Sequence, residues 1–152
     1  MSITSRIHPF LWFDGQAEEA ARFYVSIFEN ARIAHVEKTS TGPAEGGAIV
    51  EFELDGQRFG AVDGGPMYSF TPAVSFVVEC ETQDEIDYYW ARLSDGGQTQ
   101  PCGWLADKFG LSWQVIPAGL GELMEPAPKA VMEALLGMSK IDIEGLREAA
   151  EG

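Results

Sequence analysis

The sequence predicts an α+β fold made of two tandem β-α-β-β-β modules that form a cupped mixed sheet, followed by C-terminal helices. Short runs of alternating apolar residues bounded by turn residues predict the strands, and two segments with apolar residues at helical spacing predict the helices. The order of these elements also repeats. The segments "QAEEAARFY" and "TQDEIDYYW" match at an offset of 66 residues, which indicates a duplicated module.

The first module covers about residues 5–65. The aromatic-rich run "IHPFLWF" predicts a strand. A helix follows an Asp-Gly turn, with acidic Glu18 and Glu19 in its first turn. Its apolar stripe is Ala20, Phe23, Tyr24, Ile27 and Phe28. Residues 31–39 predict a second strand, and "AIVEFELDGQRFGAVDGG" predicts a hairpin that turns at Asp55-Gly56.

The second module covers about residues 72–123 and begins with a predicted strand over 73–80. Thr82 is the expected N-cap of the next helix, with Glu85 as its capping-box partner. The apolar stripe of this helix is Ile86, Tyr89, Trp90 and Leu93. The segments "QTQPCGW" and "LADKFGLSWQVIP" predict further strands, with Asp107, Lys108 and Gly110 at the hairpin turn.

We expect one domain over residues 1–125 and a helical tail over 126–152. The tail contains an amphipathic helix with Val131, Ala134, Leu135 and Met138 on one side. It packs either on its own domain or on a partner chain. Because the sheets leave edges to cover and this stripe is apolar, we expect a homodimer. The alternative is a monomer whose tail folds back.

The chain is strongly acidic, with 24 acidic against 10 basic residues and a net charge of −14. This balance argues against nucleic acids and anionic membrane surfaces as partners. No apolar run reaches the roughly 18 residues of a membrane helix, and the N-terminal segment lacks a signal-peptide pattern. Two cysteines, Cys80 and Cys102, do not make a disulfide framework and suit a cytoplasmic location.

Four blocks carry a family resemblance: "HPFLWFDGQAEEAARFYVSIF", "FELDGQRFGAVDGGP", "SFVVECETQDEIDYYWARLSDGG" and "CGWLADKFGLSWQVIP". They resemble, in this order, the vicinal oxygen chelate superfamily, which includes glyoxalase I, extradiol dioxygenases and the bleomycin and fosfomycin resistance proteins. Within it they are most similar to the PhnB-like family, often labelled a 3-demethylubiquinone-9 3-methyltransferase domain. The resemblance spans about residues 5–123 and implies a pocket cupped by the two modules.

The resemblance also implies where a metal would bind, because metal-binding members take ligands from the first and fourth strands of each module. The corresponding positions here are His8, Gly60, Ser75 or Val74, and Gln114. A catalytic divalent ion needs about three strong histidine or carboxylate ligands. One imidazole, one amide and one hydroxyl do not meet this need, so we expect no metal and no other cofactor.

His8 and Gln114 are the candidate catalytic residues. His8 begins an inward alternation and is interpreted as a general base or a ligand-orienting donor, or else as a strand histidine with a structural hydrogen bond. Gln114 binds either a substrate oxygen or a partner within the protein. The expected ligand-binding residues are Phe10, Trp12, Ser75, Trp104 and Trp113. Cys102 is interpreted as a packed thiol, because no histidine is placed to activate it.

These features leave several functions open. The first is an enzyme acting on a small organic molecule without a complete metal site, and the second is a ligand-binding or resistance-type protein without turnover. A glyoxalase-like lyase, a dioxygenase and a methyltransferase in quinone metabolism are further alternatives. The methyltransferase would require a glycine-rich turn between a strand and a helix, which the sequence lacks.

Overall fold

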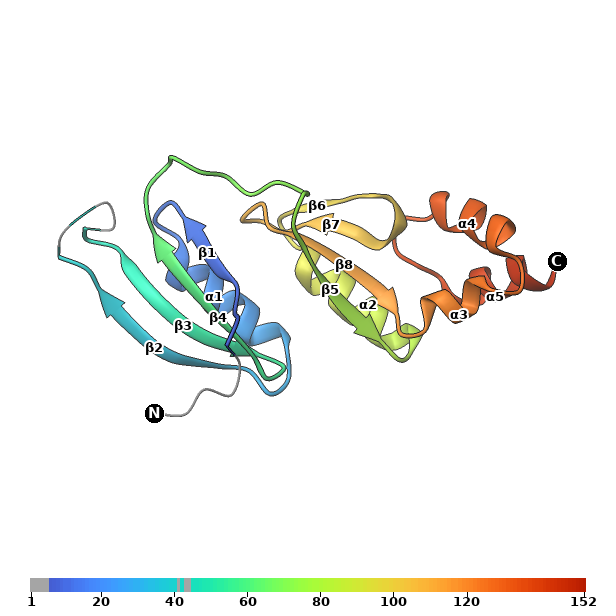
Figure 1. Ribbon diagram of the computed structural model, residues 1–152, viewed down its shortest axis with the longest axis horizontal. Coiled ribbons are helices and arrows are strands. Elements are labelled where there is room, and N and C mark those ends of the chain that lie inside the picture. Colours follow the sequence, from blue (N-terminus) through green and yellow to red (C-terminus); the bar gives the residue numbers. More distant parts are fainter. Residues whose placement is uncertain (1–5, 41, 43–44) are drawn as a thin grey trace. The chain divides into compact units, whose positions relative to one another are not determined.

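The computed structural model describes residues 6–40, 42 and 45–152. The chain forms two compact units, Met1–Ser69 and Phe70–Gly152. Each unit contains one four-stranded mixed sheet with its own helix (Figure 1). The predicted α+β fold with two β-α-β-β-β modules is therefore confirmed.

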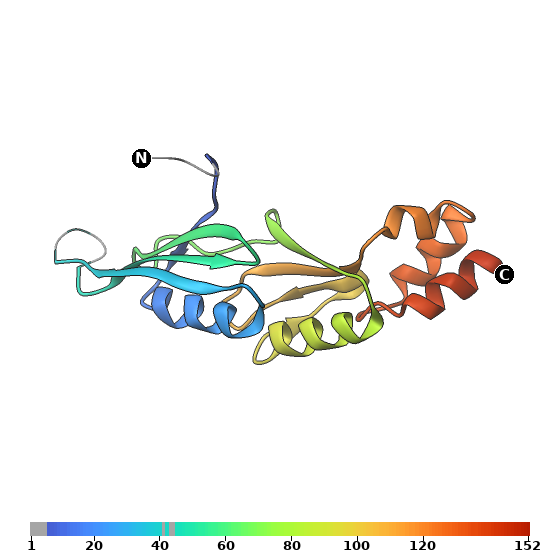
Figure 2. The same cartoon turned by 90° about the horizontal axis from the view of Figure 1, so that it is seen from below.

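The first unit contains β1 (Phe10–Phe13), α1 (Ala17–Ile27), β2 (Arg32–Lys38), β3 (Ala48–Leu54) and β4 (Gln57–Asp63). The strand order is β1-β4-β3-β2. The β1 and β4 strands are parallel, and the other neighbours are antiparallel. The α1 helix lies along one face of this sheet (Figure 2).

Alternation along β3 builds the core of the first unit. Ala48, Val50, Phe52 and Leu54 are buried, whereas the residues between them are less buried or exposed. The Phe52 ring stacks between two other aromatic rings, with centroids 6.3 Å from Tyr24 and 5.2 Å from Phe59. The predicted helix stripe is largely correct, except that Phe23 and Phe28 are only half-buried.

The hairpin between β3 and β4 turns at the predicted dipeptide. Asp55 and Gly56 both have positive φ, at 50° and 81°. Two consecutive residues with positive φ are typical of a type I′ turn, whose twist matches that of the flanking strands. Turn chemistry therefore sets the register of this ladder, in which Leu54 lies opposite Gln57.

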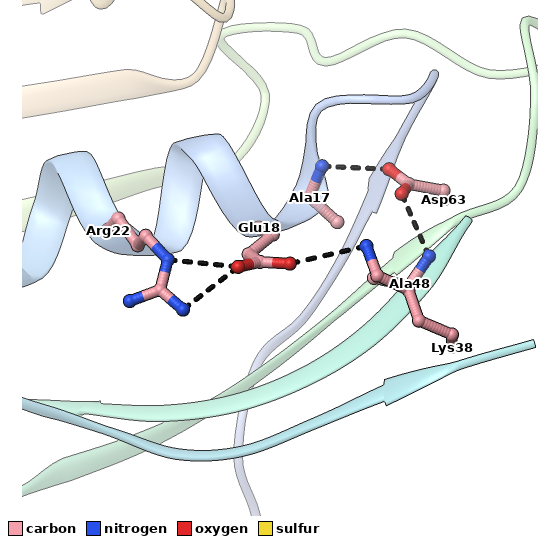
Figure 3. Close-up of polar contacts among 6 residues, drawn as sticks. All are labelled: Ala17, Glu18, Arg22, Lys38, Ala48 and Asp63. Atoms are coloured by element: carbon pink, nitrogen blue, oxygen red, sulfur yellow. Dashed lines mark hydrogen bonds and ion pairs between the residues drawn. The ribbon is translucent and has the colours of Figure 1, made fainter.

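A buried carboxylate joins three elements of the first unit (Figure 3). Asp63, at the end of β4, accepts hydrogen bonds from the backbone N–H of Ala17 at 2.7 Å and of Ala48 at 3.0 Å. It thereby fixes the start of α1 and the start of β3 beside the end of β4. Nearby, hydrogen bonds from Arg22 and Lys38 hold the pKa of Glu18 below its usual value.

The second unit repeats this plan. It contains β5 (Ser75–Cys80), α2 (Gln83–Ser94), β6 (Gln98–Thr99), β7 (Trp104–Ala106) and β8 (Ser112–Pro117). A 3-10 turn, η1 (Pro101–Gly103), precedes β7. The strand order β5-β8-β7-β6 is the same permutation as in the first unit, and β5 is parallel to β8.

The predicted N-cap of α2 is confirmed, with one change in the reciprocal bond. Thr82 Oγ1 accepts from the Glu85 N–H at 3.2 Å. The Glu85 carboxylate accepts from the Glu81 N–H at 2.7 Å, rather than from Thr82 as in a standard capping box. In the predicted stripe, Ile86 and Leu93 are buried, and Tyr89 and Trp90 are half-buried.

The C-terminal tail packs on its own chain, within the second unit. It forms α3 (Leu120–Met124), α4 (Pro128–Leu136) and α5 (Ile143–Glu151). A buried cluster holds the tail together and consists of Val131, Leu135, Ile141 and Leu146. Backbone hydrogen bonds of 2.8 Å from Cys102 to Met138 and from Gly103 to Ser139 attach it to η1.

This packing removes one of the two reasons for expecting a homodimer. Val131 and Leu135 are 0% and 7% exposed in the single chain, so their apolar stripe does not need a partner chain to cover it. Within the described residues, no helix has the length and apolar character required to cross a membrane.

We expect Asp63→Asn to destabilise the protein by about 2–3 kcal/mol, because one of the two N–H groups would then face an amide NH₂ group instead of a carboxylate oxygen. Urea denaturation measures this change in the free energy of unfolding. Glu29→Gln, which removes an exposed carboxylate from the same unit, is the matched control. Equal midpoints for the two variants would contradict the role assigned to Asp63.

Candidate functional site

The candidate site is built on the sheet face that α1 does not cover. In the β1–β4 ladder, Phe10 lies opposite Gly60 and Trp12 lies opposite Val62. These residues alternate with Leu11, Ala61 and Phe13, which are buried on the helix side. We call the side with Phe10 and Trp12 the open face of the first unit.

Two aromatic rings on this open face rest on glycines. A Cβ atom at Gly60 would lie 2.5 Å from Cδ2 of Phe10, and a Cβ atom at Gly64 would overlap the Trp12 ring. Trp12 Nε1 donates to the Gly65 carbonyl at 2.9 Å, and Tyr68 packs edge-on against the Trp12 ring at 4.9 Å. We call Phe10, Trp12 and Tyr68 the aromatic platform.

His8 lies two residues before Phe10 in the chain and contacts Arg58. The distance between Arg58 Nη2 and His8 Nδ1 is 2.7 Å. Arg58 alternates with Gly60 along β4 and therefore shares the open face with Phe10. His8 is half-buried and Arg58 is exposed, so this pair is accessible to a ligand.

The second unit also has an open face, opposite α2. Gln114 lies between Val77 on β5 and Trp104 on β7 in the two ladders. Its side-chain Nε2 donates to Ser75 Oγ at 3.0 Å. Val77 is 50% exposed, and Ser75, Trp104 and Gln114 are half-buried. The structure thus brings together three of the residues expected at the site in this unit.

Trp113 does not belong to this group, which corrects the expectation that it lines the pocket. It is 3% exposed and lies on the helix side of β8, one residue away from Gln114. Its Nε1 donates to the buried carboxylate of Asp107 at 2.9 Å. Asp107 also accepts from the N–H groups of Phe109 and Leu111, so this tryptophan stabilises the β7–β8 turn.

The cysteines occupy packed positions. Cys102 lies against the tail cluster and has a φ of 65° in the left-handed region, which the hydrogen bond to Met138 holds in place. Burial raises the pKa of the Cys80 thiol to about 11, with a smaller contribution from the Glu85 carboxylate. Cys80 therefore stays protonated at neutral pH, and neither geometry suits a nucleophile.

The donor set does not fit a divalent metal. His8 already uses Nδ1 with a guanidinium cation, and the Phe10 ring occupies the space where a side chain at position 60 would begin. Gln114 and Ser75 bond to each other. Across the described residues, no cluster of three or more histidine, cysteine or carboxylate side chains is arranged to hold a metal ion.

The turns between strand and helix do not fit a nucleotide-type methyl donor either. The β1–α1 connection has a single glycine, Gly15. The start of α2 is already capped by Thr82 and Glu85. In the described part of the chain, neither connection is a glycine-rich turn of the kind that binds S-adenosylmethionine or a dinucleotide.

Comparison with known proteins identifies the family. The family described as 3-demethylubiquinone-9 3-methyltransferase matches residues 5–116. The chain belongs to this PhnB-like family. A PhnB protein from Bacillus cereus that carries the same family description is 36% identical to it, with a TM-score of 0.70. That match covers 75% of this chain and all of the other.

More distant structures share the fold of this PhnB-like protein. The PA1353 protein from Pseudomonas aeruginosa is 18% identical over 75% of this chain and 98% of its own, with a TM-score of 0.63. The fosfomycin resistance protein FosX from Mesorhizobium loti is 15% identical over 82% and 99%, with a TM-score of 0.59. Both likenesses show that the fold is shared. No curated protein matches the sequence.

Sequence reasoning missed Arg58, Gly64 and Tyr68. Period-two alternation from Gly60 would have placed Arg58 on the same face. The seating of an indole ring on Gly64 depends on the path of the chain after β4, and Tyr68 lies in an irregular segment. No periodic pattern marks either residue.

We expect Gly64→Ala to displace the Trp12 ring, because the added methyl group would overlap it. The indole N–H of Trp12 should then lose its hydrogen bond to Gly65, which shifts its NMR resonance. Gly121→Ala is the control, because a Cβ atom there meets no heavy atom within 4 Å. An unchanged Trp12 resonance in Gly64→Ala would contradict the seating described above.

Proposed function

We propose that this PhnB-like protein binds a small, partly apolar organic molecule on an open sheet face, with the aromatic platform of the first unit as the main apolar contact. The observation that carries the proposal is the pair of rings seated on Gly60 and Gly64. Rings that are already held in place on a sheet face present apolar area at little cost in side-chain entropy. Phe10 and Tyr68 are 58% and 61% exposed, and exposed apolar clusters of this kind mark binding surfaces.

The polar groups on the same faces suit recognition of ligand oxygens. In the first unit, His8 supplies a ring nitrogen beside the platform. In the second unit, we assign ligand contacts to Gln114, Ser75 and Trp104, because the Gln114–Ser75 bond leaves the Gln114 carbonyl oxygen and the Ser75 hydroxyl proton available. Trp113 is left out of the proposed site because of its burial.

Ligand binding of this kind serves either an enzyme or a binding protein without turnover. We assign His8 to an enzymatic reaction on the open face of the first unit, as an orienting group, and Gln114 to one on the open face of the second unit, as an oxygen-binding group. The FosX structure from Listeria monocytogenes contains Mn(II) and sulfate, but the donor set here does not support a metal-dependent reaction. The turns likewise do not support the methyl transfer in the family description.

The proposal predicts that small aromatic compounds stabilise the protein thermally, and that Trp12→Ala weakens their binding by about tenfold, since a stacked aromatic contact contributes roughly 1–1.5 kcal/mol. Thermal-shift screening followed by calorimetry measures both. Trp90→Ala, which alters a half-buried ring on α2, is the matched control. Native mass spectrometry of the purified protein then identifies a retained ligand, and product analysis separates turnover from binding alone. Equal loss in both variants would argue against the platform.

We further propose a cytoplasmic homodimer. Two free thiols, one of them buried, suit a reducing compartment. Each four-stranded sheet ends in two edge strands, β1 and β2 in one and β5 and β6 in the other. Unpaired edges favour association with another chain unless they are covered, and a two-fold dimer is the commonest closed assembly.

Sedimentation equilibrium at micromolar concentration tests the homodimer, which should have twice the single-chain mass of 16.6 kDa. The tail cluster is buried within one chain. Truncation at Pro126 is therefore expected to lower the stability of the protein but to leave it dimeric. Met132 is an exposed residue on α4. Met132→Ala is the control for effects of the tail surface and should leave the mass of the assembly unchanged. A single-chain mass for the full-length protein would contradict the proposal.

A further inference from the structure

The contact between Arg58 and His8 determines which nitrogen of the histidine can act. A guanidinium group has five N–H donors and no acceptor. At 2.7 Å from Arg58 Nη2, His8 Nδ1 must therefore accept with its lone pair. The proton of the neutral imidazole then lies on Nε2, and no described residue is hydrogen-bonded to that nitrogen.

Arg58 can contact His8 because the acidic residue opposite it is already hydrogen-bonded to another arginine. Glu53 lies directly opposite Arg58 in the β3–β4 ladder. It accepts two hydrogen bonds of 3.2 Å from Arg32 on the neighbouring strand β2. Among the described residues, no carboxylate forms an ion pair with Arg58. Its N–H donors that do not contact His8 can therefore reach a ligand.

We infer that Arg58 is a positioning residue that holds His8 in the Nε2–H tautomer, and that the first open face binds a planar organic molecule through a negatively charged oxygen. This inference rests on the proposed ligand-binding function and specifies its ligand class. The oxygen accepts from His8 Nε2–H and from Arg58, while the carbon frame of the ligand lies on the aromatic platform.

The same contact decides between the two roles left open for His8. With Nδ1 engaged by Arg58 and a proton on Nε2, the neutral ring has no free lone pair. It can neither take a proton from a substrate nor ligate a metal without first breaking the contact to Arg58. His8 is therefore an orienting donor.

The tautomer is measured directly by long-range ¹H–¹⁵N NMR on protein labelled at histidine, recorded well above the ordinary histidine pKa of about 6.5. The chain contains only two histidines, and exposed His35 serves as an internal reference. We expect a pyrrole-type Nε2 and a pyridine-type, hydrogen-bonded Nδ1 for His8. Arg58→Met should give a mixture of tautomers, Arg58→Lys should keep the original one, and Arg22→Met on α1 should change nothing.

A protonated Nδ1 of His8 in the wild type would overturn the inference, as would a His8 pattern that does not respond to Arg58→Met. Arg58 is exposed, so these variants are expected to fold.

Nickel ions give a second readout that needs no ligand or activity. In the wild type, sub-stoichiometric Ni²⁺ should broaden the ring signals of His35, whose Nε2 lies 3.9 Å from the Glu37 carboxylate, and spare those of His8. In Arg58→Met the His8 signals should broaden as well. Broadening of His8 in the wild type at the concentration that affects His35 would contradict the inference.

The ligand class is tested with benzoate and benzylamine, which share a ring but carry opposite charges. Benzoate should shift the Trp12 and His8 resonances, and its affinity should fall about tenfold in Arg58→Met, as expected for a charge-assisted hydrogen bond. Equal binding of benzylamine would overturn the ligand class while leaving the proposed function intact. If neither compound shifts the Trp12 resonance, both the ligand class and the proposed function are wrong. The tautomer of His8 measured by NMR still tests the positioning role of Arg58 independently.

Discussion

One helix for each four-stranded sheet is the constraint on which the rest of the structure depends. Because α1 covers a single face, period-two alternation divides β1 and β3 into a buried set, such as Val50 and Phe52, and an open set. In the second unit, β5 and β8 show the same division beside α2. Asp63 secures this arrangement in the first unit, since its two hydrogen bonds fix where the helix and β3 begin relative to β4. The open faces are therefore a direct consequence of the topology.

An open face that carries aromatic residues must still control where their rings lie, and here glycine does so. Gly60 leaves room for the Phe10 ring across the β1–β4 ladder, and Gly64 leaves room for the Trp12 ring. At Gly60 the absence of a side chain also leaves no group that could ligate a metal at this position. Glycine at position 60 thus leaves room for the Phe10 ring and also provides no metal ligand. Exposed aromatic area and the lack of a metal ligand are therefore linked at this position.

The sequence was sufficient for the element order, the Asp55-Gly56 turn and the Thr82 cap, because these depend on local chemistry within a few residues. The family resemblance assigned Ser75 and Gln114 to one site, and the structure joins them across the β5–β8 ladder. It failed for Trp113 because neighbours along a strand point to opposite faces, and only the buried acceptor Asp107 shows which face the indole takes. The roles of Arg58 and His8 depend on the hydrogen bonds of Glu53 with Arg32 on the neighbouring strand. Contacts between strands of this kind cannot be read from one segment of the sequence.

The two units show how chemistry diverges on a repeated frame. Phe10 lies opposite Gly60 in one ladder, and Val77 lies opposite Gln114 in the other. Two residues before these come His8 and Ser75, which bond to Arg58 and Gln114 respectively. The first pair presents a donor beside a cation, and the second presents a hydroxyl beside an amide. Helix-facing residues build the same fold in both units. A family match therefore reflects this shared fold, whereas the ligand that we propose would be selected by these few open-face positions.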